Sequence, residues 1–126
     1  MMKVIGPTQP RPSALPGVAH LTRASQHDGL SSLSIWHQHL APGAQTPVHH
    51  HDCDEVVMCA AGTGEVRSKG QIESFGPHST IILPAHCEHQ ISNTGATPLE
   101  IIGVLAATPV VTRDTSGVAL ELPWQS

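Results

Sequence analysis

The chain has 126 residues, enough for one domain and too few for two hydrophobic cores of normal size. It carries 10 His beside two Trp, one Phe and no Tyr, and its formal net charge is −4. The charged residues are sparse and no basic cluster stands out, which argues against a nucleic-acid partner. A hydrophobic content of 39% argues against disorder.

The predicted elements are short strands separated by turns. Residues 1–17 hold four prolines and predict an extended N-terminal arm, and residues 18–126 predict a single domain. The dipeptide Lys69-Gly70 between two apolar stretches is typical of a hairpin. The predicted strands cover residues 18–24, 30–40, 56–60, 65–68, 71–75, 79–83, 89–92, 99–106 and 118–122. This regular spacing of short strands predicts an all-β barrel or sandwich.

The sequence contains no apolar run long enough for a signal-peptide core or a membrane span, since the longest low-polarity stretch covers residues 101–107. The three cysteines are odd in number and give no disulfide framework of the kind found in small secreted domains. These features predict a cytoplasmic protein without membrane contact.

Residues 43–62, GAQTPVHHHDCDEVVMCAAG, concentrate the side chains that bind metals. His49 and His51 are two residues apart and face the same side if they lie on a strand, and Glu55 follows in phase. A further histidine, His89, precedes a later strand in the sequence PAHCEHQISN. Three His and one Glu form a mixed N/O set suited to Zn, Fe, Mn, Ni or Cu.

The residues around these ligands divide between two faces. His50 lies between two ligands and is expected to point out of the barrel, and His37 and His39 are expected to face away from any pocket. We expect Trp36 to line a ligand pocket, because Gln38 on the same face would otherwise be a buried polar group without a partner. All six Lys and Arg residues lie outside the two histidine segments. An anionic ligand would therefore find its countercharge in the metal ion, which keeps a net charge of +1 beside one carboxylate.

The two histidine segments resemble the two motifs of the cupin superfamily. The resemblance rests on the spacings Gly43-x5-His49-x-His51-x3-Glu55-x6-Gly62 and Pro84-x4-His89-x3-Asn93. It implies a small double-stranded β-helix, which is a jelly-roll barrel. The metal ligands it implies are His49, His51, Glu55 and His89. At two turn positions the chain departs from the family, because His78 and His86 stand where glycine is usual.

The stretch SIWHQHLAPGAQTPVHHHDCDEV more closely resembles the auxin-binding protein family, whose members are zinc-binding cupins. The likeness covers about residues 17–126 with gaps. It implies one divalent metal, zinc before the other ions named above. The pocket walls that it implies are Trp36, Gln38, Thr46, Pro47 and Trp124.

Besides a subunit or sensor in which the metal is structural, two functions are open on these grounds. The first is a metal-dependent enzyme, such as a dioxygenase, isomerase or lyase, acting on a small aromatic carboxylate or an enolisable carbonyl compound. The alternative is a non-catalytic, zinc-dependent binding protein for a small carboxylate of the auxin type. A homodimer is expected in either case, because small jelly rolls with open edges usually cover an edge with a partner or an arm.

Overall fold

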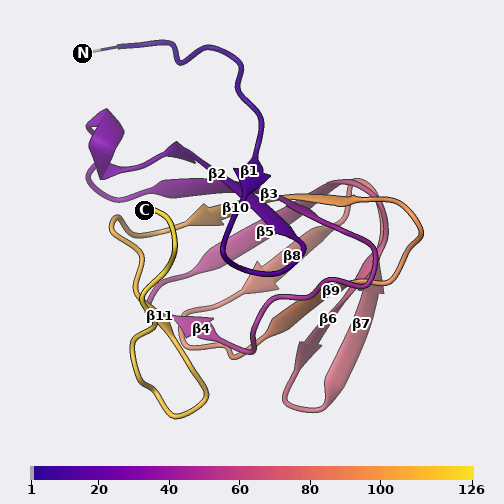
Figure 1. Ribbon diagram of the computed structural model, residues 1–126. Coiled ribbons are helices and arrows are strands. Elements are labelled where there is room, and N and C mark those ends of the chain that lie inside the picture. Colours follow the sequence, from indigo (N-terminus) through magenta and orange to yellow (C-terminus); the bar gives the residue numbers. More distant parts are fainter. Residues whose placement is uncertain (1) are drawn as a thin grey trace.

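The computed structural model describes residues 2–126 and consists almost wholly of β-strands (Figure 1). The strands are β1 (Arg11–Pro12), β2 (Val18–Ala24), β3 (Ser34–Leu40), β4 (His50–His51), β5 (Glu55–Ala61), β6 (Gly64–Ser68), β7 (Gln71–Phe75), β8 (Thr80–Leu83), β9 (Gln90–Asn93), β10 (Leu99–Leu105) and β11 (Thr112–Arg113). The helical content of residues 2–126 is a single 3-10 turn, η1 (Gln26–Asp28). Nothing helical in that range has the length and hydropathy needed to cross a membrane.

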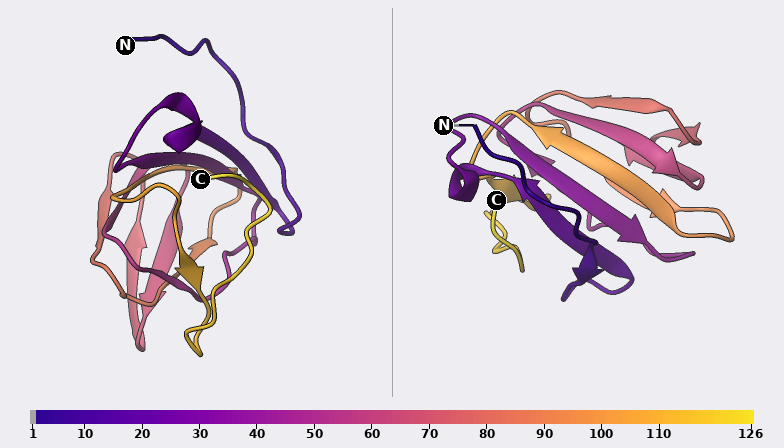
Figure 2. Two further views of the ribbon diagram at one scale, coloured as in Figure 1. Left: turned by 90° about the vertical axis from the view of Figure 1, so that its left-hand side faces the viewer. Right: turned by 90° about the horizontal axis from the view of Figure 1, so that it is seen from above.

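The strands form three antiparallel sheets that together make a jelly-roll barrel. The largest sheet has the order β1-β2-β3-β10-β5-β8, the second β7-β6-β9, and the third pairs β11 with β4. The right-hand view of Figure 2 shows β10 (orange) between β3 and β5, at the centre of the large sheet. In the left-hand view the C-terminal segment (yellow) runs across the near side of the barrel.

In the large sheet, buried and less buried residues alternate along a strand, as expected when one face of the sheet covers the core. Along β10 every second residue is buried, beginning with Leu99 and ending with Leu105. One core cluster is centred on Leu40, Leu99 and Val57, and a second holds Trp36 and Leu105. The inward residues of β3, β5 and β10 therefore reach the barrel interior from adjacent strands, which is where the predicted site residues lie.

Most of the predicted strands are confirmed. Residues 18–24 and 71–75 form strands with the predicted bounds, and five other strands differ by one residue at one or both ends. The hairpin at Lys69-Gly70 joins β6 to β7, and both turn residues adopt a positive φ.

Two predicted strands are wrong in whole or in part. The strand expected over 30–40 begins only at Ser34, because η1 is capped by Ser25 and ends at Gly29 in the left-handed conformation. The strand expected over 118–122 does not form, and one bridge between Arg113 and Ala119 remains. The Leu120 side chain lines the interior cavity, while its backbone N–H donates to the Thr112 carbonyl of β11 at 2.7 Å. Isolated contacts therefore hold this segment to β11 in place of a continuous strand. The two-residue strands β1, β4 and β11 had no sequence pattern to predict them.

The two histidines at unusual turn positions keep the backbone that glycine favours. His78 has φ 70° and His86 has φ 67°, both in the left-handed region. The turns therefore have the conformation expected of glycine, although the residues are histidines.

Candidate metal centre

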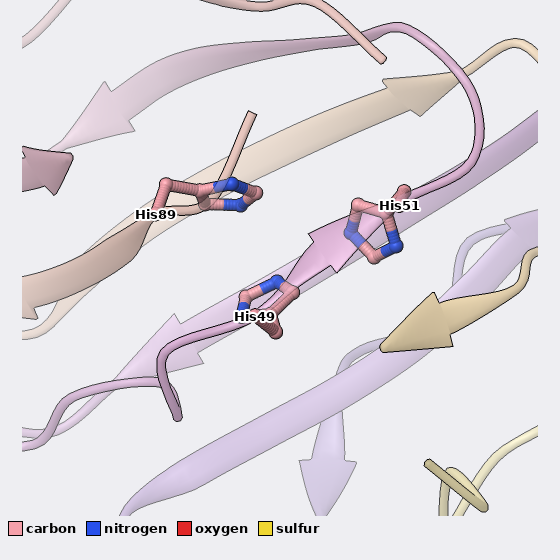
Figure 3. A group of neighbouring side chains, drawn as sticks. All are labelled: His49, His51 and His89. Carbon is pink, nitrogen blue, oxygen red and sulfur yellow. The ribbon is translucent and has the colours of Figure 1, made fainter. Parts of the chain in front are cut away.

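A pair of backbone hydrogen bonds brings the two histidine segments together. His49 and His89 form an antiparallel bridge in which each backbone N–H donates to the other residue's carbonyl, at 3.0 and 2.8 Å. His51 follows His49 by two residues, and Glu55 begins β5. Figure 3 shows the rings of His49, His51 and His89 facing one another across a common space. The three rings offer ligand nitrogens that all lie within 4.8 Å of one another.

Glu55 completes this group from the adjacent strand. Its Oε1 lies 3.4 Å from His51 Nε2 and 3.5 Å from His89 Nε2. The side chains of these three residues are almost wholly buried, so water does not replace a missing partner. Glu55 therefore lies beside two of the three histidines, and all four predicted ligands line the same cavity.

The opposite nitrogen of each ring is held by a hydrogen bond. His49 Nδ1 lies 2.6 Å from the Pro47 carbonyl oxygen, and His89 Nδ1 lies 2.8 Å from that of Cys87. A carbonyl can only accept, so in both rings Nδ1 carries the hydrogen and Nε2 of the neutral ring keeps a free lone pair. His51 Nδ1 contacts the Thr112 hydroxyl at 3.0 Å. Such contacts fix the tautomer and orientation of metal-binding histidines.

The electrostatics keep this group in the form that binds cations. Burial, together with the neighbouring His89, lowers the pKa of His49 to about 4, and burial lowers the pKa of His89. Burial acts to raise the pKa of Glu55, but the adjacent His51 and the other two rings outweigh it and leave that pKa below its usual value. At neutral pH the site thus presents the neutral imidazoles of His49 and His89 beside an ionised carboxylate.

Two unpaired atoms indicate that these residues could hold a metal ion. His51 Nε2 and Glu55 Oε1 are buried and have no hydrogen-bond partner among residues 2–126. Buried polar atoms are nearly always paired, and an imidazole nitrogen and a carboxylate oxygen that face each other without partners are two ligand atoms that a cation between them would satisfy. The donor set of three imidazoles and one carboxylate suits a divalent transition metal.

The chain gathers metal-binding side chains at two further places, and both differ from the buried group. The groups are His37, His39 and Glu100, and His50, Asp52 and His86. In the first, one Glu100 oxygen contacts both rings, at 2.6 and 3.1 Å, and the Arg23 guanidinium donates to His37 Nδ1. In the second, Arg113 holds Asp52 through both carboxylate oxygens. Their carboxylates are already paired within the protein.

Gly103 makes room for the Glu55 carboxylate. It lies on β10 between Trp36 and Val57, and a Cβ at this position would come within 2.7 Å of Glu55 Oε2. Sequence reasoning missed this residue, although a glycine inside an apolar strand indicates a close approach of another group. It also missed Thr112 and His20, for which no sequence pattern points to the site.

All of the predicted pocket residues line one cavity beside the four predicted ligands. Its volume is about 280 Å³, and the lining includes Trp36, Gln38, Thr46, Pro47 and Trp124. Thr46 also has a structural role, because its hydroxyl accepts the Ile91 backbone N–H. His37 and His39 lie outside this cavity, as expected from their alternation with Trp36 and Gln38.

The cavity wall is mainly apolar and carries no fixed positive charge. Among residues 2–126 its lining contains no Lys or Arg. Of the two carboxylates near the C-terminal side, Asp114 is engaged by hydrogen bonds within its own turn, and Glu121 is exposed. The buried histidine and glutamate cluster is thus the polar end of an otherwise apolar cavity.

Comparison with solved structures defines the class of protein. The polyketide cyclase RemF from Streptomyces resistomycificus matches with a TM-score of 0.75 and 20% identity, over 98% of this chain and 90% of that chain. A Cupin 2 conserved barrel domain protein from Salinispora arenicola matches with a TM-score of 0.72 and 19% identity, over 84% and 90%. At such identities the likeness concerns the fold, and the fold is that of a small cupin.

Sequence comparison then gives the family. The model of the Auxin binding protein family matches residues 5–113, and the chain belongs to this family. Auxin-binding protein 1 of Arabidopsis thaliana is 32% identical over 105 residues, which are 75% of this chain and 53% of that protein. Auxin-binding protein T92 of Nicotiana tabacum is 32% identical over 106 residues, which are 75% of this chain and 57% of that protein. The chain thus spans about half the length of the curated relatives it matches.

Proposed function

We propose that this protein binds a small carboxylate, preferably an aromatic one, at a divalent metal held by His49, His51, Glu55 and His89. The proposal rests chiefly on the buried, unpaired Nε2 of His51 and Oε1 of Glu55, which face each other beside two further neutral imidazoles. Zinc is the metal proposed first. A divalent ion in this set would attract an anionic oxygen donor by its residual positive charge.

The apolar walls support the same ligand class. The Trp36 side chain is buried, and its ring lies 5.6 Å from that of His51 and 5.4 Å from that of Trp124. These rings would cover the apolar part of a ligand whose carboxylate points to the centre. The names of the relatives, auxin-binding proteins, are consistent with a small organic acid of this type.

Catalysis on a small carboxylate or an enolisable carbonyl compound is the second candidate function. It is favoured by the shape of the site, in which a cavity of about 280 Å³ opens directly onto the four ligands. Redox-active iron in protein purified without oxygen, together with product formation, would support a dioxygenase. Stoichiometric zinc with tight binding and no product would support a binding protein. We further propose a cytoplasmic homodimer.

The metal assignment is tested by His51→Ala, with His39→Ala as a matched control on the outer face of the sheet. We expect elemental analysis to find about one zinc per chain in the parent and in the control. In His51→Ala the zinc content should fall at least about tenfold, and the melting temperature should fall by about 5–10 °C, because metal binding adds to folding stability. Full zinc occupancy in His51→Ala would refute the proposed ligand set.

The ligand class is tested by calorimetry with phenylacetate. Binding is expected to the zinc-loaded protein and not to protein treated with a chelator. Binding that survives removal of the metal would contradict a carboxylate held at the metal.

A further inference from the structure

The most informative polar group outside the ligand set is the Gln38 amide, which lines the same cavity. Gln38 is buried on β3, and its Nε2 lies 3.1 Å from His20 Nδ1 on β2. His20 in turn lies 2.7 Å from Thr22, whose hydroxyl lies 2.6 Å from the Gln125 carbonyl oxygen. This chain of contacts determines which hydrogen-bonding groups remain for a ligand.

The direction of each hydrogen bond in this series follows from its last member, the Gln125 carbonyl. The Gln125 carbonyl can only accept, so the Thr22 hydroxyl donates to it and has no hydrogen left for His20. His20 Nε2 must therefore be the donor to Thr22. His20 is buried and stacks on Trp124 with ring centroids 3.9 Å apart, which favours the neutral ring. In that tautomer His20 Nδ1 carries no hydrogen and accepts a hydrogen bond.

The unprotonated His20 Nδ1 fixes the orientation of the Gln38 amide. The Gln38 NH₂ group must point toward His20 Nδ1, because a flipped amide would bring two lone pairs together. No described residue donates to the remaining carbonyl oxygen, Oε1. This oxygen is not among the fully buried unpaired atoms, and Gln38 lines the cavity, so a ligand there can supply the missing donor.

We propose that His20 is a positioning residue that makes Gln38 a selector for ligands with a hydrogen-bond donor. The ligand class is then a small planar carboxylic acid that carries a hydroxyl or ring N–H on the part remote from its carboxylate. The inference rests on the proposed function, in which the carboxylate lies at the four metal ligands.

The spacing of the residues suits such a molecule. Gln38 follows Trp36 by two residues on the same face of β3, which is about 7 Å along a strand, and Trp36 contacts His51. The indole N–H groups of Trp36 and Trp124 are buried without acceptors in the same walls. A hydroxyl or ring N–H can donate to Gln38 Oε1, which a group that only accepts cannot do.

The test compares phenylacetates that carry a hydroxyl or a methyl group at the 3- or 4-position, by calorimetry on zinc-loaded protein. Hydroxyl and methyl are similar in size, and in a purely apolar cavity the methyl compound would bind more tightly. We expect at least one hydroxyl compound to bind about tenfold more tightly than its methyl counterpart, the range for a buried hydrogen bond. If neither hydroxyl compound binds more tightly, the inference is wrong, even when all four acids bind.

Three variants separate positioning from general stability, and the readout is the ratio of the hydroxyl and methyl affinities. Gln38→Met removes the amide at similar size and should reduce the ratio to about one. Thr22→Val frees the His20 tautomer without altering the cavity wall, and His20→Phe keeps a ring against Trp124, so both should lower the ratio while unsubstituted phenylacetate still binds. His39→Phe, on the opposite face of the same strand as Gln38, should leave the ratio unchanged.

The outcomes distinguish the two proposals. If no phenylacetate binds the zinc-loaded protein, the proposed function fails and the inference with it. If all bind in a zinc-dependent way and the ratio is the same in the parent, Gln38→Met and Thr22→Val, the proposed function stands and the inference alone is overturned.

Discussion

At the scale of single residues, the site depends on atoms that have no hydrogen-bond partner among residues 2–126. His51 Nε2 and Glu55 Oε1 are buried 3.4 Å apart, and backbone carbonyls fix the tautomers of His49 and His89. Burial without pairing costs about 1–3 kcal/mol for a neutral group and more for a charged one. The metal-free protein therefore carries this cost in its folded state, and metal binding would remove it.

Gly103 gives a prediction at the same scale. Gly103→Ala places a Cβ within 2.7 Å of Glu55 Oε2 and should displace that carboxylate. We expect zinc affinity, measured by competition with a chelating dye, to fall by about tenfold or more. Gly76→Ala is the control, since its Cβ would meet only a methyl group at 4.0 Å. Equal zinc affinity in Gly103→Ala and the parent would show that the carboxylate does not need this space.

At the scale of elements, the C-terminal segment closes one side of the cavity without belonging to a sheet. Leu122 and Trp124 pack against the cluster that contains Trp36 and Leu105. The last residue, Ser126, is buried and accepts the Val110 backbone N–H at 3.0 Å. The segment is therefore held by side-chain packing and single hydrogen bonds rather than by strand pairing.

Trp124→Ala tests the role of this segment. The substitution removes one wall of the cavity and the stacking partner of His20, but no metal ligand. We expect unchanged zinc content. The affinity for phenylacetate should fall by up to about tenfold, as for the loss of a buried aromatic wall. Phenylacetate affinity equal to that of the parent would place the ligand away from the C-terminal segment.

At the scale of the whole molecule, buried histidines make stability depend on pH. The pKa of His20 and that of His49 are each lowered to about 4 by burial and by neighbouring histidines, against 6.5 for a free ring. Between pH 6.5 and 4 the unfolded chain takes up protons that the folded chain refuses, so stability falls as the pH falls. Above pH 6.5 this contribution is fully present.

This gives a prediction for the metal-free protein. Urea unfolding should show stability decreasing from pH 6.5 to pH 4, with each of these two histidines contributing up to about 3 kcal/mol. His20→Phe should reduce the slope in this range, whereas the exposed His27→Phe should leave it unchanged. A slope that is the same in all three proteins would contradict the lowered pKa of His20.

The outer edges of the sheets predict self-association. Strands β7 and β8 are edges of their sheets, and Ile72 and Ile82 on them are 49% and 66% exposed. Exposed apolar edges favour a partner. We expect light scattering to give about twice the chain mass of 13.3 kDa, and Ile82→Lys to shift the mass toward the monomer. A monomeric mass for the parent would refute the homodimer.

The sequence by itself determined the fold class and the candidate ligands, because both depend on local pattern. Alternating apolar residues predict strands such as β2 and β7, and the spacing of His49, His51 and Glu55 places them on one side of the chain. The motif spacing also pointed to His89. These features are periodic or lie close together along the chain, so they can be recognised without knowledge of distant contacts.

Only the tertiary structure decided the contacts between distant segments. Gly103 lies against the Glu55 carboxylate because β10 pairs beside β5, and the tautomer of His20 depends on Gln125, which is 105 residues away. The stretch 118–122 has the composition of a strand, yet it is joined to β11 only by the Ala119 bridge to Arg113 and the Leu120 N–H bond to Thr112. The Leu120 side chain lines the cavity. Long-range packing therefore fixes the shape and hydrogen bonding of the cavity, while local pattern fixes the fold that contains it.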